Sequence, residues 1–247
     1  MLTYNKLKKT RRKFLALTGL TPKEFTRLLP TFERVYGRKY PSKKTHVGKA
    51  RKRKAGGGRK GNLHSVEQKL LFALVYQKTY PLQALIGEVF ELSQSRANDW
   101  IHRLLPVLKQ TLASLKVLPE RNPRQFARRK KRKAETVELI IDGTERRRQR
   151  PKNPEKQALH YSGKKKVHSD KNVLLVDVKT KRVDYLSQTC VGKTHDKKIA
   201  ETERISYPRE TTLHKDTGFQ GYEPRVQKTF QPKKTSQRRV NSVGETE

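Results

Sequence analysis

Two aspartates in this basic sequence stand where a metal-dependent reaction needs carboxylates. Asp142 follows the β-branched run 137–141, and Asp216 follows the short run 211–213 and precedes Thr217-Gly218. A carboxylate at the end of a strand points into the loop layer where active sites of α/β folds lie. Two carboxylates brought together there repel each other unless a cation lies between them, and Mg²⁺ prefers such oxygen ligands. A cation held in this way can activate a water or a 3′-hydroxyl for phosphoryl transfer.

The same two aspartates have a plain structural alternative. Asp-Gly and Asp-x-Gly are common turn sequences, because the aspartate side chain can bond to the backbone just after it. On these residues alone the turn is the simpler interpretation of Asp142 and Asp216, and the metal site stays an open hypothesis.

The segment that carries both aspartates has the pattern of a mixed α/β domain. We predict a helix over residues 195–206. The predicted strands lie at 137–141, 165–168, 173–178, 182–190 and 211–213.

Upstream, apolar residues at helical spacing predict a bundle of helices. A first helix starts at Thr21-Pro22, with Glu24 placed for a capping box. Over 66–108 we predict a helix, a short helix, a tight turn at 92–95 and a third helix that is kinked or restarts at Pro106.

Helix, short helix, turn and helix in this order are typical of a helix-turn-helix. Its last helix presents residues to base edges in the major groove. An ordinary three-helix core with a polar outer face is the alternative. The residues expected to contact DNA are Gln94, Ser95, Arg96, Asn98 and Arg103.

The charge of the chain favours a polyanionic partner. Lys and Arg number 59 against 23 Asp and Glu, which gives a formal net charge of +36. The sequence has no run of about 18 apolar residues, the length needed to span a membrane. Nucleic acid is therefore the expected partner, and the cytoplasm, with the nucleoid, is the expected location. Basic stretches separate the ordered segments. The expected domains are a helical segment at 1–37, a basic linker at 38–62, the helix-turn-helix at 63–120, a second basic linker at 121–134 and the mixed domain at 135–247.

Several motifs occur in a fixed order along about residues 10 to 239. In the N-terminal half they are Thr18-Gly19-Leu20-Thr21, Gly56-Gly57-Gly58-Arg59-Lys60 and Leu92-Ser93-Gln94-Ser95-Arg96-Ala97. Downstream they are Asp142-Gly143-Thr144-Glu145-Arg146, Tyr161-Ser162-Gly163-Lys164-Lys165-Lys166, Thr194-His195-Asp196 and Asp216-Thr217-Gly218-Phe219-Gln220-Gly221-Tyr222. With these motifs in this order, the sequence resembles bacterial insertion-sequence transposases of the DDE superfamily.

The resemblance implies an RNase H-like endonuclease domain that uses Mg²⁺ or Mn²⁺ to nick DNA and transfer strands at element ends. It implies that Asp142 and Asp216 are the first and second catalytic, metal-binding acids. Lys164, Lys165 and Lys166 would contact phosphates, with a solvated edge strand as the alternative. For His195-Asp196 a structural role is favoured over metal binding. The implied partners are double-stranded DNA, both terminal repeats and target, and a second copy of the chain.

The family also needs a third acid, a glutamate on a helix beyond Pro232-Lys233-Lys234. Only Glu245 and Glu247 follow, and Gly244 weakens any helix there, so neither is expected to serve. We therefore expect a C-terminally truncated transposase whose RNase H-like domain lacks its C-terminal helices, and which binds DNA but nicks it poorly. The alternatives are a DNA-binding protein that occupies transposon ends without catalysis, and an RNA-associated basic protein.

Overall fold

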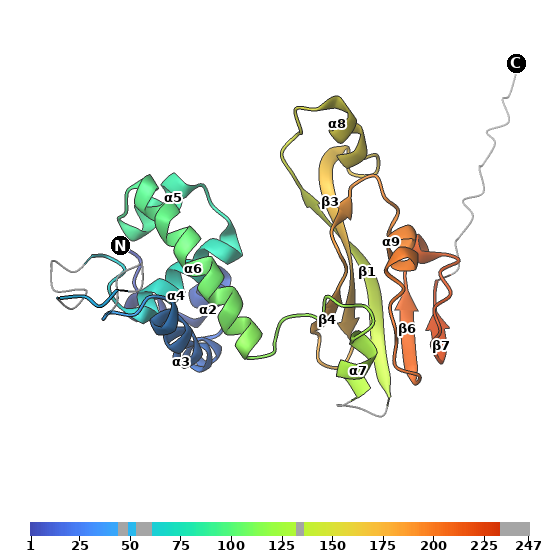
Figure 1. Cartoon of the computed structure of the whole chain (residues 1–247), viewed down its shortest axis with the longest axis horizontal. Helices are drawn as coiled ribbons and strands as arrows, with labels where there is room; N and C mark the ends of the chain where they lie inside the picture. The colour runs from blue at the N-terminus through green and yellow to red at the C-terminus, as the bar shows by residue number, and fades with distance from the viewer. Residues whose placement is uncertain (44–48, 53–60, 132–135, 233–247) are drawn as a thin grey trace, which may run out of the picture. The chain divides into compact units, whose positions relative to one another are not determined.

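The computed structural model describes residues 1–43, 49–52, 61–131 and 136–232. The chain divides into two compact units, Met1–Leu118 and the residues from Pro119 onward, and the units are described separately (Figure 1). Within the described residues, no helix combines the length and the apolar character needed to cross a membrane. The expected third-acid candidates, Glu245 and Glu247, lie outside the described residues.

The first unit is all-helical. It begins with α1 (Tyr4–Leu7), α2 (Arg11–Thr18) and α3 (Pro22–Lys39). The Thr21 side chain accepts a hydrogen bond from the Glu24 amide while Glu24 bonds back to the Thr21 amide, which is the predicted capping box. From α3, residues spaced three and four apart enter the core; they are Phe25, Leu28, Phe32 and Val35.

Three further helices complete this core: α4 (Val66–Thr79), α5 (Gln83–Phe90) and α6 (Gln94–Ser114). Helix α4 is buried on every side over residues 68–76, so it is the central helix of the bundle. It ends where Tyr80 takes a left-handed conformation, with φ of 43°. Helix α6 continues through Pro106 as one element, so the predicted restart there does not occur.

The second unit is built on a mixed sheet. Its order is β2-β3-β1-β6-β7, with β4 and β5 also pairing with β3. Strand β1 is antiparallel to β3 and parallel to β6, and β7 continues the parallel half. The strands are β1 (Val137–Arg147), β2 (Tyr161–Ser162), β3 (Val167–Asp177), β4 (Val183–Leu186), β5 (Cys190–Val191), β6 (Thr211–Lys215) and β7 (Lys228–Phe230).

The helical elements of this unit are short. They are α7 (Phe126–Lys131), α8 (Pro154–His160), α9 (Asp196–Glu203) and the 3₁₀ turn η1 (Thr217–Phe219). A helical first unit followed by this mixed sheet confirms the predicted fold class, a helix-turn-helix region with an RNase H-like domain.

One face of the sheet carries the core of the second unit. Strand β1 alternates buried and exposed residues from Val137 to Asp142, and its buried members pack against Ile199 and Ala200 of α9. Phe126 of α7 joins the same core with 1% of its surface exposed. The stretch 121–134, expected as a linker, thus supplies a core side chain.

Three local features differ from the sequence-based predictions. Strand β1 does not end at residue 141 but runs on to Arg147. The two strands predicted at 165–168 and 173–178 form one strand, β3. Helix α8 was not predicted.

Candidate active site and DNA-binding helix

The parallel pairing of β1 with β6 brings the two predicted aspartates together. The register runs from Val137↔Thr211 to Ile141↔Lys215. Asp142 is the next residue of β1, and Asp216 directly follows the end of β6 and caps η1. Neighbouring strands lie about 5 Å apart, so the two Cα positions are side by side. Both aspartates are exposed.

The two aspartates lie on the face of the sheet opposite the core. Side chains alternate between the faces of a strand, so Glu138 shares a face with Asp142, and His214 shares one with Asp216. Glu138 Oε1 lies 2.7 Å from His214 Nε2, which shows that these two faces are the same. The site is therefore a carboxylate pair on an open surface of the sheet.

Each aspartate also bonds to the backbone after it. Asp142 Oδ1 accepts from the Gly143 amide at 2.8 Å, and Asp216 Oδ1 accepts from the Gly218 amide at 2.9 Å. Only the Asp216 bond is of the turn type, because it reaches two residues on at the start of η1; Asp142 lies within strand β1, so the turn alternative does not hold for it. The two bonds use one oxygen of each side chain, so an oxygen of each remains available to a cation.

Among the described residues there is no group of three or more His, Cys, Asp or Glu side chains placed to hold a metal ion. The carboxylate pair is thus an incomplete ligand set by itself. Because carboxylate oxygens are suitable ligands for Mg²⁺ or Mn²⁺, the two residues fit a divalent cation that takes its other ligands from water or DNA.

Asp196 lies on the other side of β1. A Cβ atom added at Gly143 would come within 2.5 Å of Asp196 Cγ, so the first turn of α9 rests directly on the β1 backbone. The Asp196 carboxylate also lies 3.7 Å from Lys171 Nζ. Contacts of this kind support the structural role that was favoured for His195-Asp196.

Glu145 of the Asp142 motif is held inside a hydrogen-bonded cluster. Burial raises the pKa of Glu145, but hydrogen bonds from Ser162 and Ser169 and the charges of Lys171 and Lys165 outweigh it and lower the pKa. The Glu145 carboxylate is therefore ionised and already satisfied by its neighbours.

The three lysines of the hairpin do not line the aspartate pair. Lys164, Lys165 and Lys166 are exposed between β2 and β3, whereas Asp142 pairs with Leu174 in the middle of β3. Seven residues separate Val167 from Leu174, or about 23 Å along a strand. These three lysines therefore do not lie beside the carboxylate pair, and their contact with phosphates stays a prediction.

In the first unit, the elements α4, α5 and α6 form the predicted helix-turn-helix. Glu91 ends α5 in a left-handed conformation and Ser93 caps α6 by accepting from the Arg96 amide. A Cβ atom at Gly87 would lie 2.7 Å from the Leu92 carbonyl oxygen. The tight turn therefore depends on a glycine at residue 87.

The residues expected to contact DNA fall on different sides of α6. Gln94, Ser95 and Arg96 are exposed, while Asn98 is half-buried. The Arg103 guanidinium lies over the Tyr40 ring at 5.1 Å and the Trp100 ring at 5.2 Å, so its contacts are within the unit.

The residues expected to contact DNA leave out one exposed residue on the outer face of α6. His102 is exposed and lies two turns after Ser95, on the side opposite the buried Ala97 and Ile101. The seven-residue spacing from Ser95 is the signal that could have identified it.

Two comparisons with protein families agree with this geometry. Residues 61–114 match the family described as the helix-turn-helix of DDE superfamily endonuclease. Residues 141–243 match the family described as DDE superfamily endonuclease. The two matches together support a DDE-superfamily transposase-like protein. No curated protein and no solved structure matches the chain significantly.

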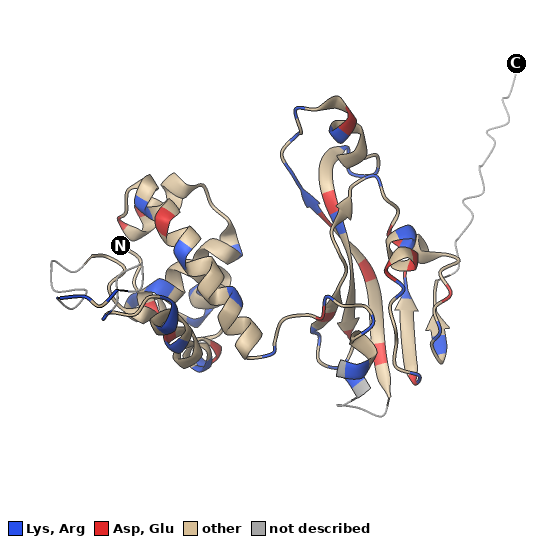
Figure 2. Cartoon of the chain, viewed as in Figure 1, with Lys and Arg blue, Asp and Glu red and all other residues tan. Residues whose placement is uncertain are grey.

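A DDE-superfamily transposase-like protein accounts for the two units together. A helix-turn-helix that binds DNA precedes a nuclease domain of a family that generally uses divalent metal ions. The charge distribution suits this substrate, since Lys and Arg occur over both units (Figure 2).

Proposed function

We propose that this chain is a transposase that cleaves DNA at the ends of a mobile element, with a divalent cation, Mg²⁺ or Mn²⁺, held between Asp142 and Asp216. The observation that carries the proposal is the strand register, in which both aspartates directly follow the pair Ile141↔Lys215. Two exposed carboxylates this close repel each other and are stabilised by a shared cation.

The residues have separate tasks in this proposal. Asp142 and Asp216 would hold the cation on the open face of the sheet, where it would help to orient a phosphodiester. A divalent cation there would lower the pKa of a water and offset charge on the scissile phosphate. The attacking oxygen joins phosphorus as the bond from phosphorus to the 3′-oxygen breaks, which leaves a 3′-hydroxyl for strand transfer.

Recognition of the element ends belongs to the first unit in this proposal. The exposed Gln94, Ser95 and Arg96 at the start of α6 would meet base edges in the major groove, with His102 on the same outer side of the helix. No described residue pairs with the Arg96 guanidinium, which leaves it available to guanine or phosphate.

A nicking assay on supercoiled plasmid tests the catalytic assignment. We expect slow cleavage with Mn²⁺ or Mg²⁺, because the carboxylate pair is an incomplete ligand set by itself, and none with EDTA. Asp142→Asn and Asp216→Asn should each lower the rate by about 100-fold or more, since each removes a cation ligand, while DNA affinity is kept. The matched control is Glu210→Gln, which removes one negative charge at an exposed position at the opposite end of β6.

The outcomes of this assay separate the possibilities. Cleavage that survives in both aspartate variants would overturn the assignment. DNA binding with no cation-dependent cleavage by the unaltered chain would instead leave a protein that occupies element ends without catalysis.

A further inference from the structure

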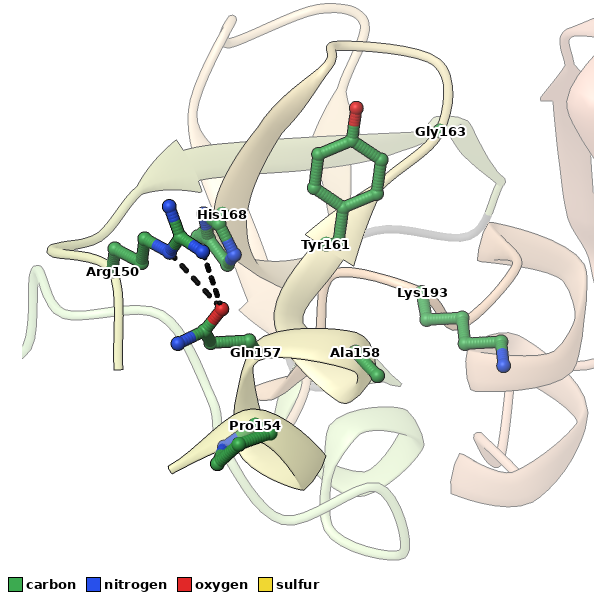
Figure 3. Close-up of a pocket in the computed structure, with 8 residues that line it drawn as sticks. All are labelled: Arg150, Pro154, Gln157, Ala158, Tyr161, Gly163, His168 and Lys193. Carbon is green, nitrogen blue, oxygen red and sulfur yellow. Dashed lines mark hydrogen bonds between the residues drawn. The ribbon is translucent and has the colours of Figure 1, made fainter. Parts of the chain in front are cut away.

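An open hollow lies in the second unit, away from the aspartate pair. It is formed between α8 and the β2–β3 hairpin and has a volume of about 760 Å³, within the range of small-molecule sites. Figure 3 shows its lining, with Arg150 and Lys193 on opposite sides and Tyr161 between them. We call it the Tyr161 hollow.

The charges at the rim of the Tyr161 hollow are not neutralised by acids. Two N–H groups of Arg150 donate to Gln157 Oε1 at 3.0 and 2.8 Å. This neutral amide fixes the guanidinium without cancelling its charge. Among the described residues, no carboxylate pairs with Arg150 or Lys193.

The surrounding sequence reinforces this charge. Residues 146–166 contain nine Lys or Arg and a single acid, Glu155 (Figure 2). A local excess of this size attracts a polyanion, and the field is strongest where cations converge around a hollow.

The interior of the hollow adds an aromatic surface to these cations. Tyr161 is 42% exposed, and its ring meets the His168 ring edge-on, with centroids 5.6 Å apart and an interplanar angle of 67°. Pro154, Ala158 and Gly163 complete the wall with small, uncharged surfaces. A surface that contacts only phosphates has no need of an exposed ring, whereas an unpaired base stacks on one.

The position of the hollow relates it to the carboxylate pair. The Arg148 amide donates to the His168 carbonyl at 2.9 Å, so the hollow begins level with Arg148, which directly follows the end of β1 and lies six residues beyond Asp142. Six residues of strand span about 20 Å, which is about six base pairs of duplex DNA. DNA held at the carboxylate pair can therefore reach the hollow.

We propose that the Tyr161 hollow receives one unpaired nucleotide of the DNA substrate. The base stacks on the Tyr161 ring, and the flanking phosphates lie against Arg150 and Lys193. The inference rests on the proposed function only in taking DNA as the substrate; it does not require cleavage.

Binding of two DNA probes in EDTA, where cleavage does not occur, tests the inference. One probe is a blunt duplex, and the other is the same duplex with a short single-stranded thymidine overhang, made with either strand polarity. Measured by fluorescence anisotropy, the unaltered chain should bind one overhang probe about 10-fold more tightly, as expected for stacking of one base. Tyr161→Ala should abolish this preference without changing affinity for the blunt duplex, and Tyr161→Phe should keep it.

The cations are tested with the same probes. Arg150→Gln and Lys193→Gln should each weaken binding of the overhang probe. Each should also lower the slope of log affinity against log salt concentration by about one. The matched control is Lys179→Gln, an exposed lysine beyond the far end of β3, which should leave the overhang preference intact.

Two results would overturn the inference. They are equal affinity of the unaltered chain for blunt and overhang probes, and an overhang preference that survives Tyr161→Ala. Failure of the proposed function has a different signature, because a chain that never nicks plasmid can still show the Tyr161-dependent preference. If the chain nicks plasmid but shows no such preference, the proposed function stands and only the role of the Tyr161 hollow is refuted.

Discussion

At the scale of single residues, the best-defined electrostatic contact in the second unit joins α7 to the end of β3. Lys130 contacts the carboxylates of both Asp177 and Asp184. Burial raises the pKa of Asp177, but hydrogen bonds from Lys130 and Thr180 outweigh it and lower the pKa to about 2. The folded state thus favours the ionised carboxylate.

A pH-dependent contribution to stability follows from this lowered pKa. The contribution is fully present above the ordinary value of 3.8, and it is lost as the pH falls through 2. Asp177→Asn should lower the free energy of unfolding at pH 7 by about 2 kcal/mol. Urea unfolding at pH 7 and between pH 2 and 4 measures both effects. If the free energy of unfolding falls as steeply with acid in the variant as in the unaltered chain, Asp177 is not the origin of the pH dependence.

Gly143 is a second residue whose environment makes a specific prediction. Because an added Cβ atom would lie 2.5 Å from Asp196 Cγ, Gly143→Ala should destabilise the second unit by about 1–3 kcal/mol. The double variant Gly143→Ala/Asp196→Ala lacks this contact, so most of the lost stability should be recovered. Urea unfolding measures the stability of each variant. If the losses in the two single variants simply add in the double variant, the close approach of residue 143 to Asp196 does not affect stability.

The two aspartates could be placed from sequence, whereas the lysine hairpin could not. The short runs before Asp142 and Asp216 are strands, and a strand pair in parallel register brings their ends together. The position of Lys164–Lys166 depends instead on the full length of β3, which could not be predicted from the sequence. Ser169 and Asn172 interrupt its apolar pattern but are buried, and Asn172 Nδ2 donates to the Ser187 carbonyl at 2.8 Å.

At the scale of elements, the predicted helices have a buried face, but a buried face was not sufficient for prediction: α2 buries Phe14 and α7 buries Phe126, and neither helix was predicted. Helix α3 has both a capping box and apolar residues at helical spacing, so its start was predicted to the residue. Helix α8 buries none of its residues, and a helix without an apolar face leaves no periodic signal. The Tyr161 hollow is formed in part by α8, so it could not be predicted from the sequence.

Helix α6 carries two arginines that should respond differently to mutation. Both are exposed, but the Arg103 guanidinium also lies over the Tyr40 and Trp100 rings. On a duplex enriched from a random pool by the unaltered chain, Arg96→Ala should weaken binding by about 1–3 kcal/mol and leave stability unchanged. Arg103→Ala should instead lower the stability of the first unit by about 1 kcal/mol, through loss of the cation–π contacts.

Anisotropy measurements paired with thermal unfolding distinguish these two roles. Gln110→Ala, at an exposed position near the end of the same helix, is the control for both. The assignment of α6 as the DNA-reading helix fails if Arg96→Ala binds the enriched duplex as well as the unaltered chain does.

At the scale of the whole molecule, the described residues form two separate hydrophobic cores. One comprises side chains from α1 to α6, and the other joins the sheet with α7 and α9. The sequence indicated this division through the change from helical to strand periodicity. A net charge of +36 destabilises compact states through self-repulsion, and bound DNA offsets it.

Two cores of this kind should unfold in two separable transitions. The only tryptophan of the chain, Trp100, lies in the first unit, so its fluorescence reports that unit, while circular dichroism reports both. Phe72→Ala removes a fully buried ring from the first core, and Phe219→Ala removes one from the second. Each should destabilise its own unit by about 3–5 kcal/mol.

In urea titrations, Phe72→Ala should move the fluorescence midpoint, and Phe219→Ala should move only the circular dichroism component that fluorescence does not follow. Conservative changes at the same sites, Phe72→Leu and Phe219→Leu, should give smaller shifts in the same direction. A single transition that both alanine variants shift equally would mean that the two cores unfold as one cooperative unit.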